Sequence, residues 1–253
     1  SRNEVDGREF ARRITEAYLR YVAPHRPAEL RTLLDPQALR TLLDAGDRAA
    51  FYSSDPRYVN DMRALLDVLA ARDMDALGDW RTLQERYVLV RDLDAARGLA
   101  VKHQDLSVIP PLVVDVQLPK PWLLKVGPQG LALAGHSPKP GYTIYAIGHP
   151  DCHFSQNAVA DIEADPVLRD AFLKHAVWLS PQAGRLQIER FRAWNREHPL
   201  ATMSQVWKQE EWPWVDSWAT PTFYFIRDGQ VQAKVIGWPK EGRLRELESA
   251  IAR

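Results

Sequence analysis

Residues 142–155 read YTIYAIGHPDCHFS, and they place the single cysteine of the chain, Cys152, shortly after a run of β-forming residues. Tyr142–Ile147 predicts a buried strand, because it is short, apolar and rich in aromatic and β-branched side chains. Phe154–Ile162 has the apolar spacing of a helix. The stretch therefore predicts a strand, a short turn, and a thiol at the start of the helix that follows.

Beyond this stretch the predicted elements alternate between helix and strand. Asp228-Gly229 separates two β-rich runs, and this dipeptide favours the positive φ angles of a type I′ hairpin turn. The order strand, helix, strand, helix, hairpin, helix predicts an α/β domain with a mixed sheet flanked by helices. The further elements are helices at Val167–Lys174 and Leu186–Trp194, a strand at Ala176–Leu179, hairpin strands at Thr222–Ile226 and Val231–Ile236, and a last helix from Pro239.

The first hundred residues predict a small helical bundle, so the chain as a whole is α+β. Asp35-Pro36 and Asp55-Pro56 each combine an N-cap residue with a proline in the first helical turn. Gly46 is expected to end the first of these two helices. Asp79-Trp80 is expected to begin a further helix. The apolar faces are predicted at Phe10, Ile14 and Tyr18, at Tyr58, Met62, Leu65, Leu66 and Leu69, and at Leu83 and Tyr87.

A short β segment at 108–134 is expected to follow the helices. Its predicted strands contain Val113, Val114 and Val116, then Trp122–Val126, then Leu131–Ala134. The proline- and glycine-rich stretch at 136–141 is predicted to be a linker. This places a mainly helical domain at 1–135 and a second domain at 142–253.

The composition excludes some classes of function. Basic and acidic residues balance at 33 each, and no basic patch points to a nucleic acid. No apolar run is long enough to span a bilayer. One cysteine excludes a disulfide within the chain and any metal site made of several cysteines. The chain begins at Ser1 without a methionine, which suits a processed or trimmed protein.

Two landmarks, DCHFS at 151–155 and WATPTF at 218–223, resemble the thioredoxin-like superfamily of thiol:disulfide interchange proteins. The resemblance covers the chain from Gly141 to Arg253. It implies a sheet of mixed direction flanked by helices, with an active-site cysteine where the first strand meets its helix. The predicted order of elements from Tyr142 onward agrees with this arrangement.

The resemblance also implies roles for three residues before the hairpin. In this superfamily the proline at that place is cis and faces the active-site cysteine, and by position that proline is Pro221. Thr220 precedes it, and Trp218 borders the groove in which an extended substrate peptide lies. Thr220, Pro221 and Trp218 are therefore expected to bind substrate.

Cys152 is the predicted nucleophile. A thiol at a helix N-terminus is favoured as the thiolate by unpaired backbone N–H groups and by the helix dipole. A protonated His153 would add to this effect, whereas Asp151 would oppose it. Ser155 stands where most oxidoreductases of this superfamily carry a second cysteine, and a serine substituted for a resolving cysteine would give the same pattern. The candidate catalytic residues are Cys152, His153 and Ser155.

The Cys152–Ser155 pattern predicts mixed-disulfide chemistry of the isomerase or reductase type, since the chain lacks a resolving thiol. Protein disulfides or thiols are the expected partners, with glutathione as a co-substrate and no bound cofactor. The helical part is expected to serve dimerisation or docking. The resemblance implies a periplasmic or otherwise exported protein, with the cytoplasm as the alternative.

Two other interpretations stay open, and three residues also raise the question of a metal site. The fold could serve recognition only, as a redox-inactive module that binds other proteins. Cys152-His-Phe-Ser155 also resembles the Cys-Gly-Phe-Ser motif of monothiol glutaredoxins, which hold an iron–sulfur cluster with glutathione; here His153 replaces the glycine. His149, Cys152 and His153 could reach a soft metal such as Cu(I), but further soft ligands are missing, so no metal site is expected.

Overall fold

The computed structural model describes residues 2–25, 32, 34–114, 119–127, 130–138 and 141–252. These residues form two compact units. One unit contains residues Ser1–Pro110 together with Ala183–Leu186, and the other contains Pro111–Gln182 and Gln187–Arg253. Among the described residues, no helix is both long and apolar enough to cross a membrane.

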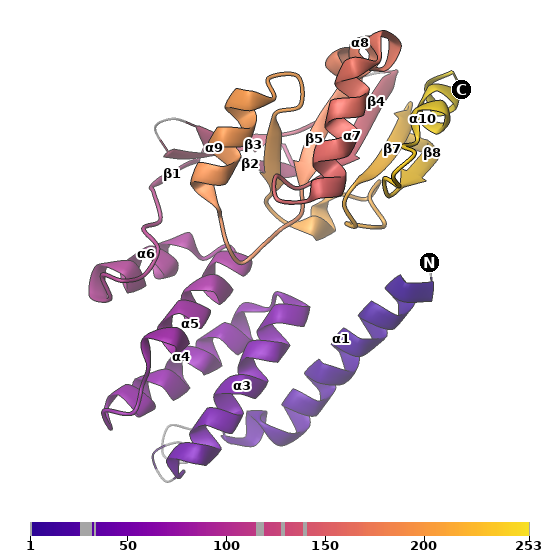
Figure 1. The fold of residues 1–253 in the computed structure, drawn as a ribbon. Coiled ribbons are helices and arrows are strands. Elements are labelled where there is room, and N and C mark those ends of the chain that lie inside the picture. The colour runs from indigo at the N-terminus through magenta and orange to yellow at the C-terminus, as the bar shows by residue number, and fades with distance from the viewer. Residues whose placement is uncertain are drawn as a thin grey trace. The chain divides into compact units, whose positions relative to one another are not determined.

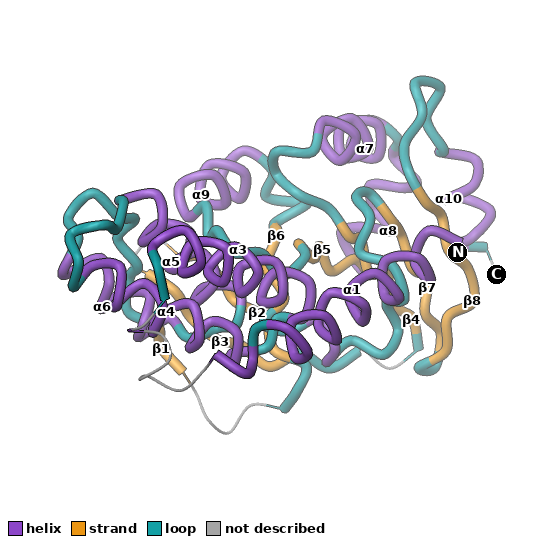
Figure 2. The backbone as a smooth tube through the Cα atoms, turned by 90° about the horizontal axis from the view of Figure 1, so that it is seen from below, coloured by secondary structure: helices purple, strands orange, loops and turns teal. Residues whose placement is uncertain are grey.

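The first unit is helical, as the sequence predicts. Its helices pack against one another in chain order (Figure 2). Asp35 and Asp55 are N-caps, whose carboxylates accept hydrogen bonds from the backbone N–H groups of Ala38 and Arg57. The α-helices are α1 (Arg2–Tyr21), α3 (Pro36–Ser53), α4 (Pro56–Ala70), α5 (Leu77–Leu89) and α6 (Leu93–Lys102), and a 3₁₀ turn, η1, spans Ala23–His25.

Gly46 does not end α3, which corrects the prediction from sequence. The helix continues to Ser53. A Cβ atom at Gly46 would lie 2.9 Å from Cγ of Met62 and 3.8 Å from the ring of Tyr18. The glycine therefore permits the close approach of α3 to α4, and it interrupts neither helix.

The second unit is built on one sheet, shown in Figure 1. Eight strands of the described residues pair in the order β1-β3-β2-β6-β5-β4-β7-β8. β4 is parallel to β5 and antiparallel to β7, so the sheet is mixed. The strands are β1 (Leu112–Val114), β2 (Trp122–Gly127), β3 (Gly130–Gly135), β4 (Tyr142–Ile147), β5 (Ala176–Ser180), β6 (Met203–Val206), β7 (Thr222–Arg227) and β8 (Gln230–Ile236).

The division of the chain differs from the one expected at 136–141. β2 pairs antiparallel with β6, through Leu123 opposite Val206 and Leu124 opposite Gln205. This pairing makes the segment at 108–134 part of the same sheet as β4, and the compact units separate at Pro110. Val116 and residues 139–140 of the expected linker lie outside the described residues.

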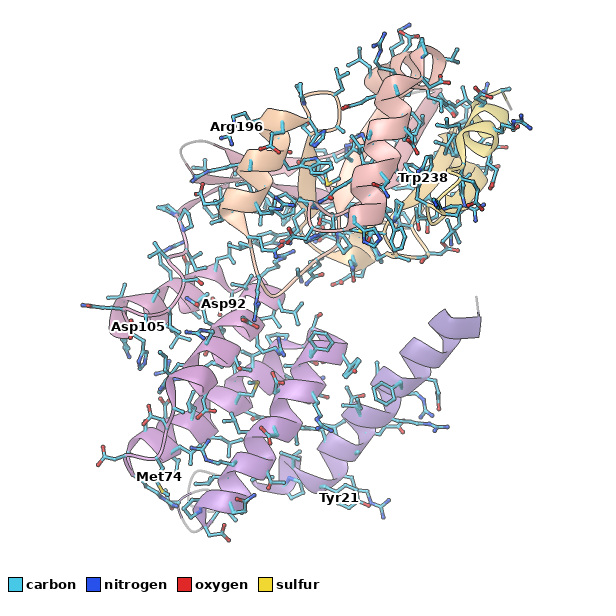
Figure 3. All side chains as sticks on the ribbon, in the orientation of Figure 1. Tyr21, Met74, Asp92, Asp105, Arg196 and Trp238 are labelled. Carbon is cyan, nitrogen blue, oxygen red and sulfur yellow. The ribbon has the colours of Figure 1, made fainter. Side chains whose placement is uncertain are left out.

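One face of the sheet is covered by α7 (His153–Ala164), α8 (Pro166–His175), α9 (Ile188–Glu197) and α10 (Leu244–Ile251). Their apolar sides meet the sheet in one core, which includes Phe191 and Phe223. The last helix begins at Leu244, five residues after the predicted start at Pro239. Trp238, labelled in Figure 3, comes directly before this interval and is buried. Its indole N–H donates a hydrogen bond to Asp161 of α7 at 2.8 Å.

The opposite face of the sheet is covered by the segment that joins β6 to β7. Trp212 is the largest fully buried side chain there, and it packs with Tyr145 and Tyr224. The hairpin between β7 and β8 turns at Asp228 and Gly229, with φ angles of 49° and 78°. Positive values at both positions are those of a type I′ turn, as predicted.

Residues 183–186 form a loop that packs on α5 within the helical unit. Arg185 pairs with Glu85 at 2.7 Å, and Leu186 is buried. A Cβ atom at Gly184 would lie 2.8 Å from the backbone oxygen of Glu85. A backbone oxygen cannot move away from the added methyl group as the end of a flexible side chain could.

Gly184→Ala is therefore expected to destabilise the protein by about 1–3 kcal/mol, measured by urea unfolding. The matched control is Gly98→Ala on α6, where a Cβ atom meets nothing within 4 Å. That variant should gain about 0.5–1 kcal/mol from helix propensity. Equal stability of the two variants would contradict the packing of the loop on α5.

Candidate functional site

The turn between β4 and α7 presents Cys152. The backbone N–H of Gly148 donates to the carbonyl of Leu179 at 2.8 Å, which holds the start of the turn on β5. The N–H of Cys152 donates to the carbonyl of His149 at 3.0 Å and closes the turn. Cys152 is the N-cap residue of α7, with φ −85° and ψ 109°. The sulfur therefore stands at the amino end of a twelve-residue helix, where free N–H groups gather.

The pairing of β4 with β7 brings Thr220 and Pro221 next to the turn that presents Cys152. β4 and β7 are antiparallel, so the end of β4 at Ile147 lies opposite the start of β7 at Thr222. The Thr220–Pro221 peptide bond is cis. The thiol of Cys152 donates to the carbonyl of Thr220 at 3.5 Å, across 68 residues of sequence. The predicted landmarks thus meet where β4 ends and β7 begins.

The surroundings of Cys152 favour the thiolate. Partial burial raises the pKa of the thiol, but hydrogen bonds lower it by more, so the pKa lies below its ordinary value. The hydroxyls of Thr220 and Ser155 favour the charged sulfur, and the backbone N–H groups of Ser155 and Phe154 add to this effect. The Cys152 residue is half-buried.

Ser155 lies beneath the sulfur. It is fully buried, and its Oγ accepts a hydrogen bond from the backbone N–H of His149 at 3.3 Å. With that acceptor position used, its own O–H is available to donate to the sulfur. Ser155 therefore holds the turn before Cys152 and also stabilises the thiolate of Cys152.

His153 and Trp218 lie apart from this group of contacts. The His153 side chain is exposed, and its ring contacts that of Phe154 in a tilted arrangement, with centroids 3.8 Å apart. Trp218 and Trp214 are partly buried against the core that contains Trp212. Most of the tryptophan surface before the hairpin is thus used in packing.

The sequence did not predict that three residues act together near the site: His149, Gln187 and Arg190. Arg190 donates to Oδ1 of Asp151 at 2.6 Å and to the carbonyl of Pro150 at 3.1 Å. Gln187 donates to Oδ2 of Asp151 at 2.9 Å. Gln187 and Arg190 are 36 and 39 residues from Asp151 in sequence, so no local pattern could have linked them.

His149 belongs to the same network. Its Nδ1 accepts the backbone N–H of Asp151 at 3.1 Å, so this nitrogen carries no proton. Burial lowers the pKa of the imidazole, and the Asp151 carboxylate and the Gln187 side chain oppose that effect only in part. The neutral ring packs edge-on to Phe191 of α9.

Metal-ligating side chains do not gather in the part of the chain that the structure describes: no group of three or more His, Cys, Asp or Glu could hold an ion. Nδ1 of His149 accepts a hydrogen bond in the turn, and the His153 ring contacts Phe154.

The order β5-β4-β7-β8, with a helix after β4 and a helix after the hairpin, defines a thioredoxin-like fold. Neither a protein-family model nor a curated protein matches the chain. Two solved structures are similar to it. One is the C-terminal domain of an uncharacterized protein from Bacteroides fragilis NCTC 9343, with 17% identity and a TM-score of 0.37, covering 54% of this chain and 95% of that one.

The other is a thioredoxin-like protein from Bacteroides caccae ATCC 43185. It has 11% identity and a TM-score of 0.36, and the match covers 94% of this chain and 83% of that one. Neither similarity bears on activity.

Proposed function

We propose that this protein is a thiol–disulfide exchange protein that uses Cys152 as its nucleophile. The observation that carries the proposal is the position of the sulfur at the start of α7, against Thr220 and beside Ser155. The side chains of Thr220 and Ser155 and the backbone N–H groups at the start of α7 favour the thiolate, which is the nucleophilic form of cysteine. A redox-inactive module needs no such stabilisation of the thiolate, whereas a glutathione–cluster binder would also use it, as a metal ligand.

The exchange has two steps. The Cys152 thiolate attacks one sulfur of a substrate disulfide; a bond forms between the two sulfurs, the substrate disulfide breaks, and the second substrate sulfur leaves as a thiolate that takes a proton from water. In the second step another thiol attacks the mixed disulfide and releases Cys152. The attacking sulfur forms a new disulfide with the substrate sulfur, and Cys152 leaves as a thiolate. In isomerisation the attacking thiol belongs to the substrate, which gains a rearranged disulfide. In reduction it belongs to glutathione, and a second glutathione then attacks the substrate–glutathione disulfide, which frees the substrate thiol and gives oxidised glutathione.

Thr220 is placed to align a substrate next to the sulfur. Its carbonyl already accepts the hydrogen of the thiol, so it lies within reach of a chain that approaches Cys152. Ser155 cannot complete an internal disulfide, because it has no sulfur. Only a thiol from outside the chain can therefore resolve the mixed disulfide. This requirement suits isomerisation or glutathione-dependent reduction.

The proposal predicts fast reaction of the folded protein with oxidised glutathione at pH 7. The product is one glutathione adduct at Cys152, seen by mass spectrometry and removed by reduced thiol. The matched control is the same chain unfolded in urea, in which the single thiol has lost its neighbours. We expect the folded chain to form the adduct several times faster, and a slower reaction of the folded chain would refute the proposal.

A further inference from the structure

The residue that precedes the nucleophile carries a negative charge. Asp151 adjoins Cys152 in the turn, and an unpaired carboxylate there would oppose the thiolate. The structure pairs this carboxylate on both of its oxygens. Arg190 holds Oδ1 and Gln187 holds Oδ2.

Both partners come from the start of α9. Gln187 is the N-cap residue of that helix and has a left-handed backbone, with φ 45°. This conformation is uncommon for a residue other than glycine, asparagine or aspartate, so tertiary contacts must hold it. Arg190 lies in the first turn, and its guanidinium reaches both the carboxylate of Asp151 and the carbonyl of Pro150. A lysine could not make both contacts with the same planar geometry.

We propose that Arg190 and Gln187 are positioning residues, which pair the charge of Asp151 and fix the turn that presents Cys152. The inference rests on the proposed function, since it concerns the reactivity of the same sulfur. His149 takes part through its contacts with Asp151 and Gln187. Besides Asp151, the turn carries two titratable side chains, those of His149 and of the exposed His153.

The test is the pH profile of Cys152 alkylation by iodoacetamide, which reports on the only thiol of the chain. Arg190→Gln leaves the Asp151 charge unpaired, and the midpoint of the profile should rise by about half a pH unit. Asp151→Asn should lower the midpoint or leave it in place. In the double variant the midpoint should return to near that of the unmodified protein, because neither charge is left.

The second-site rescue separates this role from a merely structural one. If the contact only fixed the turn, Arg190→Gln and Asp151→Asn would both raise the midpoint, since each variant breaks the same contact. Arg196→Gln is the matched control, because it removes the same charge from the last turn of the same helix (Figure 3). It should leave the midpoint unchanged. Arg190 and Asp151 are both half-exposed, so the variants are expected to fold.

An unchanged midpoint in Arg190→Gln would overturn the inference, and so would a raised midpoint that Asp151→Asn fails to restore. These outcomes do not depend on exchange activity. If the midpoint moves as expected while the protein forms no glutathione adduct, the proposed function fails and the positioning role stands. If the adduct forms while the midpoint stays fixed, the positioning role fails alone.

Discussion

Cys152→Ser is expected to abolish isomerisation of a disulfide-scrambled model protein, reducing it to the rate without added protein. The chain has no other sulfur nucleophile, since Cys152 is its only cysteine. A hydroxyl in its place cannot form a mixed disulfide. The loss should be complete, whereas changes at neighbouring residues alter only the rate.

The same variant provides its own control for folding. Cys152 occupies the N-cap position of α7, where serine is a preferred residue. Its free energy of unfolding should therefore be equal to that of the unmodified protein or up to about 1 kcal/mol higher. Residual isomerisation in a folded Cys152→Ser protein would show that another group does the chemistry.

Ser155→Cys is expected to convert the protein into a dithiol oxidoreductase. Ser155 lies against the Cys152 sulfur, and a second sulfur at that position would attack the glutathione adduct from within the chain. The new bond joins the two cysteines, and glutathione leaves as a thiol. Because this step is intramolecular, release of glutathione should accelerate by roughly two orders of magnitude or more.

Mass spectrometry distinguishes the products of this experiment. The unmodified protein should keep one glutathione, whereas Ser155→Cys should lose two hydrogens and carry no adduct. Ser249→Cys on α10 is the matched control, because its exposed thiol adds a second cysteine far along the chain from the site. If Ser155→Cys retains glutathione as stably as that control does, the contact between residues 152 and 155 is wrong.

The strands and helices with strong local patterns were predictable. The buried run at Tyr142–Ile147, the caps at Asp35 and Asp55, and the turn at Asp228-Gly229 follow from side-chain chemistry close in sequence. β6 was not predictable in this way. Met203–Val206 is a four-residue strand with a single β-branched side chain, and its pairing with β2 and β5 determines it.

That pairing also explains the misplaced domain boundary. Proline and glycine at 136–141 indicate a break in regular structure, but they do not say which sheet the flanking strands join. Gly46 is a second example, since the sequence alone does not distinguish a glycine that allows two helices to approach from one that ends a helix. Both errors come from contacts between residues distant in sequence.

For the site, the roles of Cys152 and of the Thr220-Pro221 pair were predictable. In the structure the Cys152 thiol lies within hydrogen-bonding distance of the Thr220 carbonyl. The partners of Asp151 could not be inferred, because they come from a helix more than thirty residues away. Sequence also suggested that His153 aids the thiolate, whereas the groups that favour it are Thr220, Ser155 and the start of α7.

The most direct measurement of the central claim is the thiol pKa of Cys152 itself, from the pH dependence of alkylation in the folded protein and in urea. The folded protein should titrate clearly below the ordinary cysteine value of about 8.5, and the unfolded chain should titrate near it. A folded midpoint at or above that of the unfolded chain would contradict the account, because the start of α7 would then give the sulfur no activation.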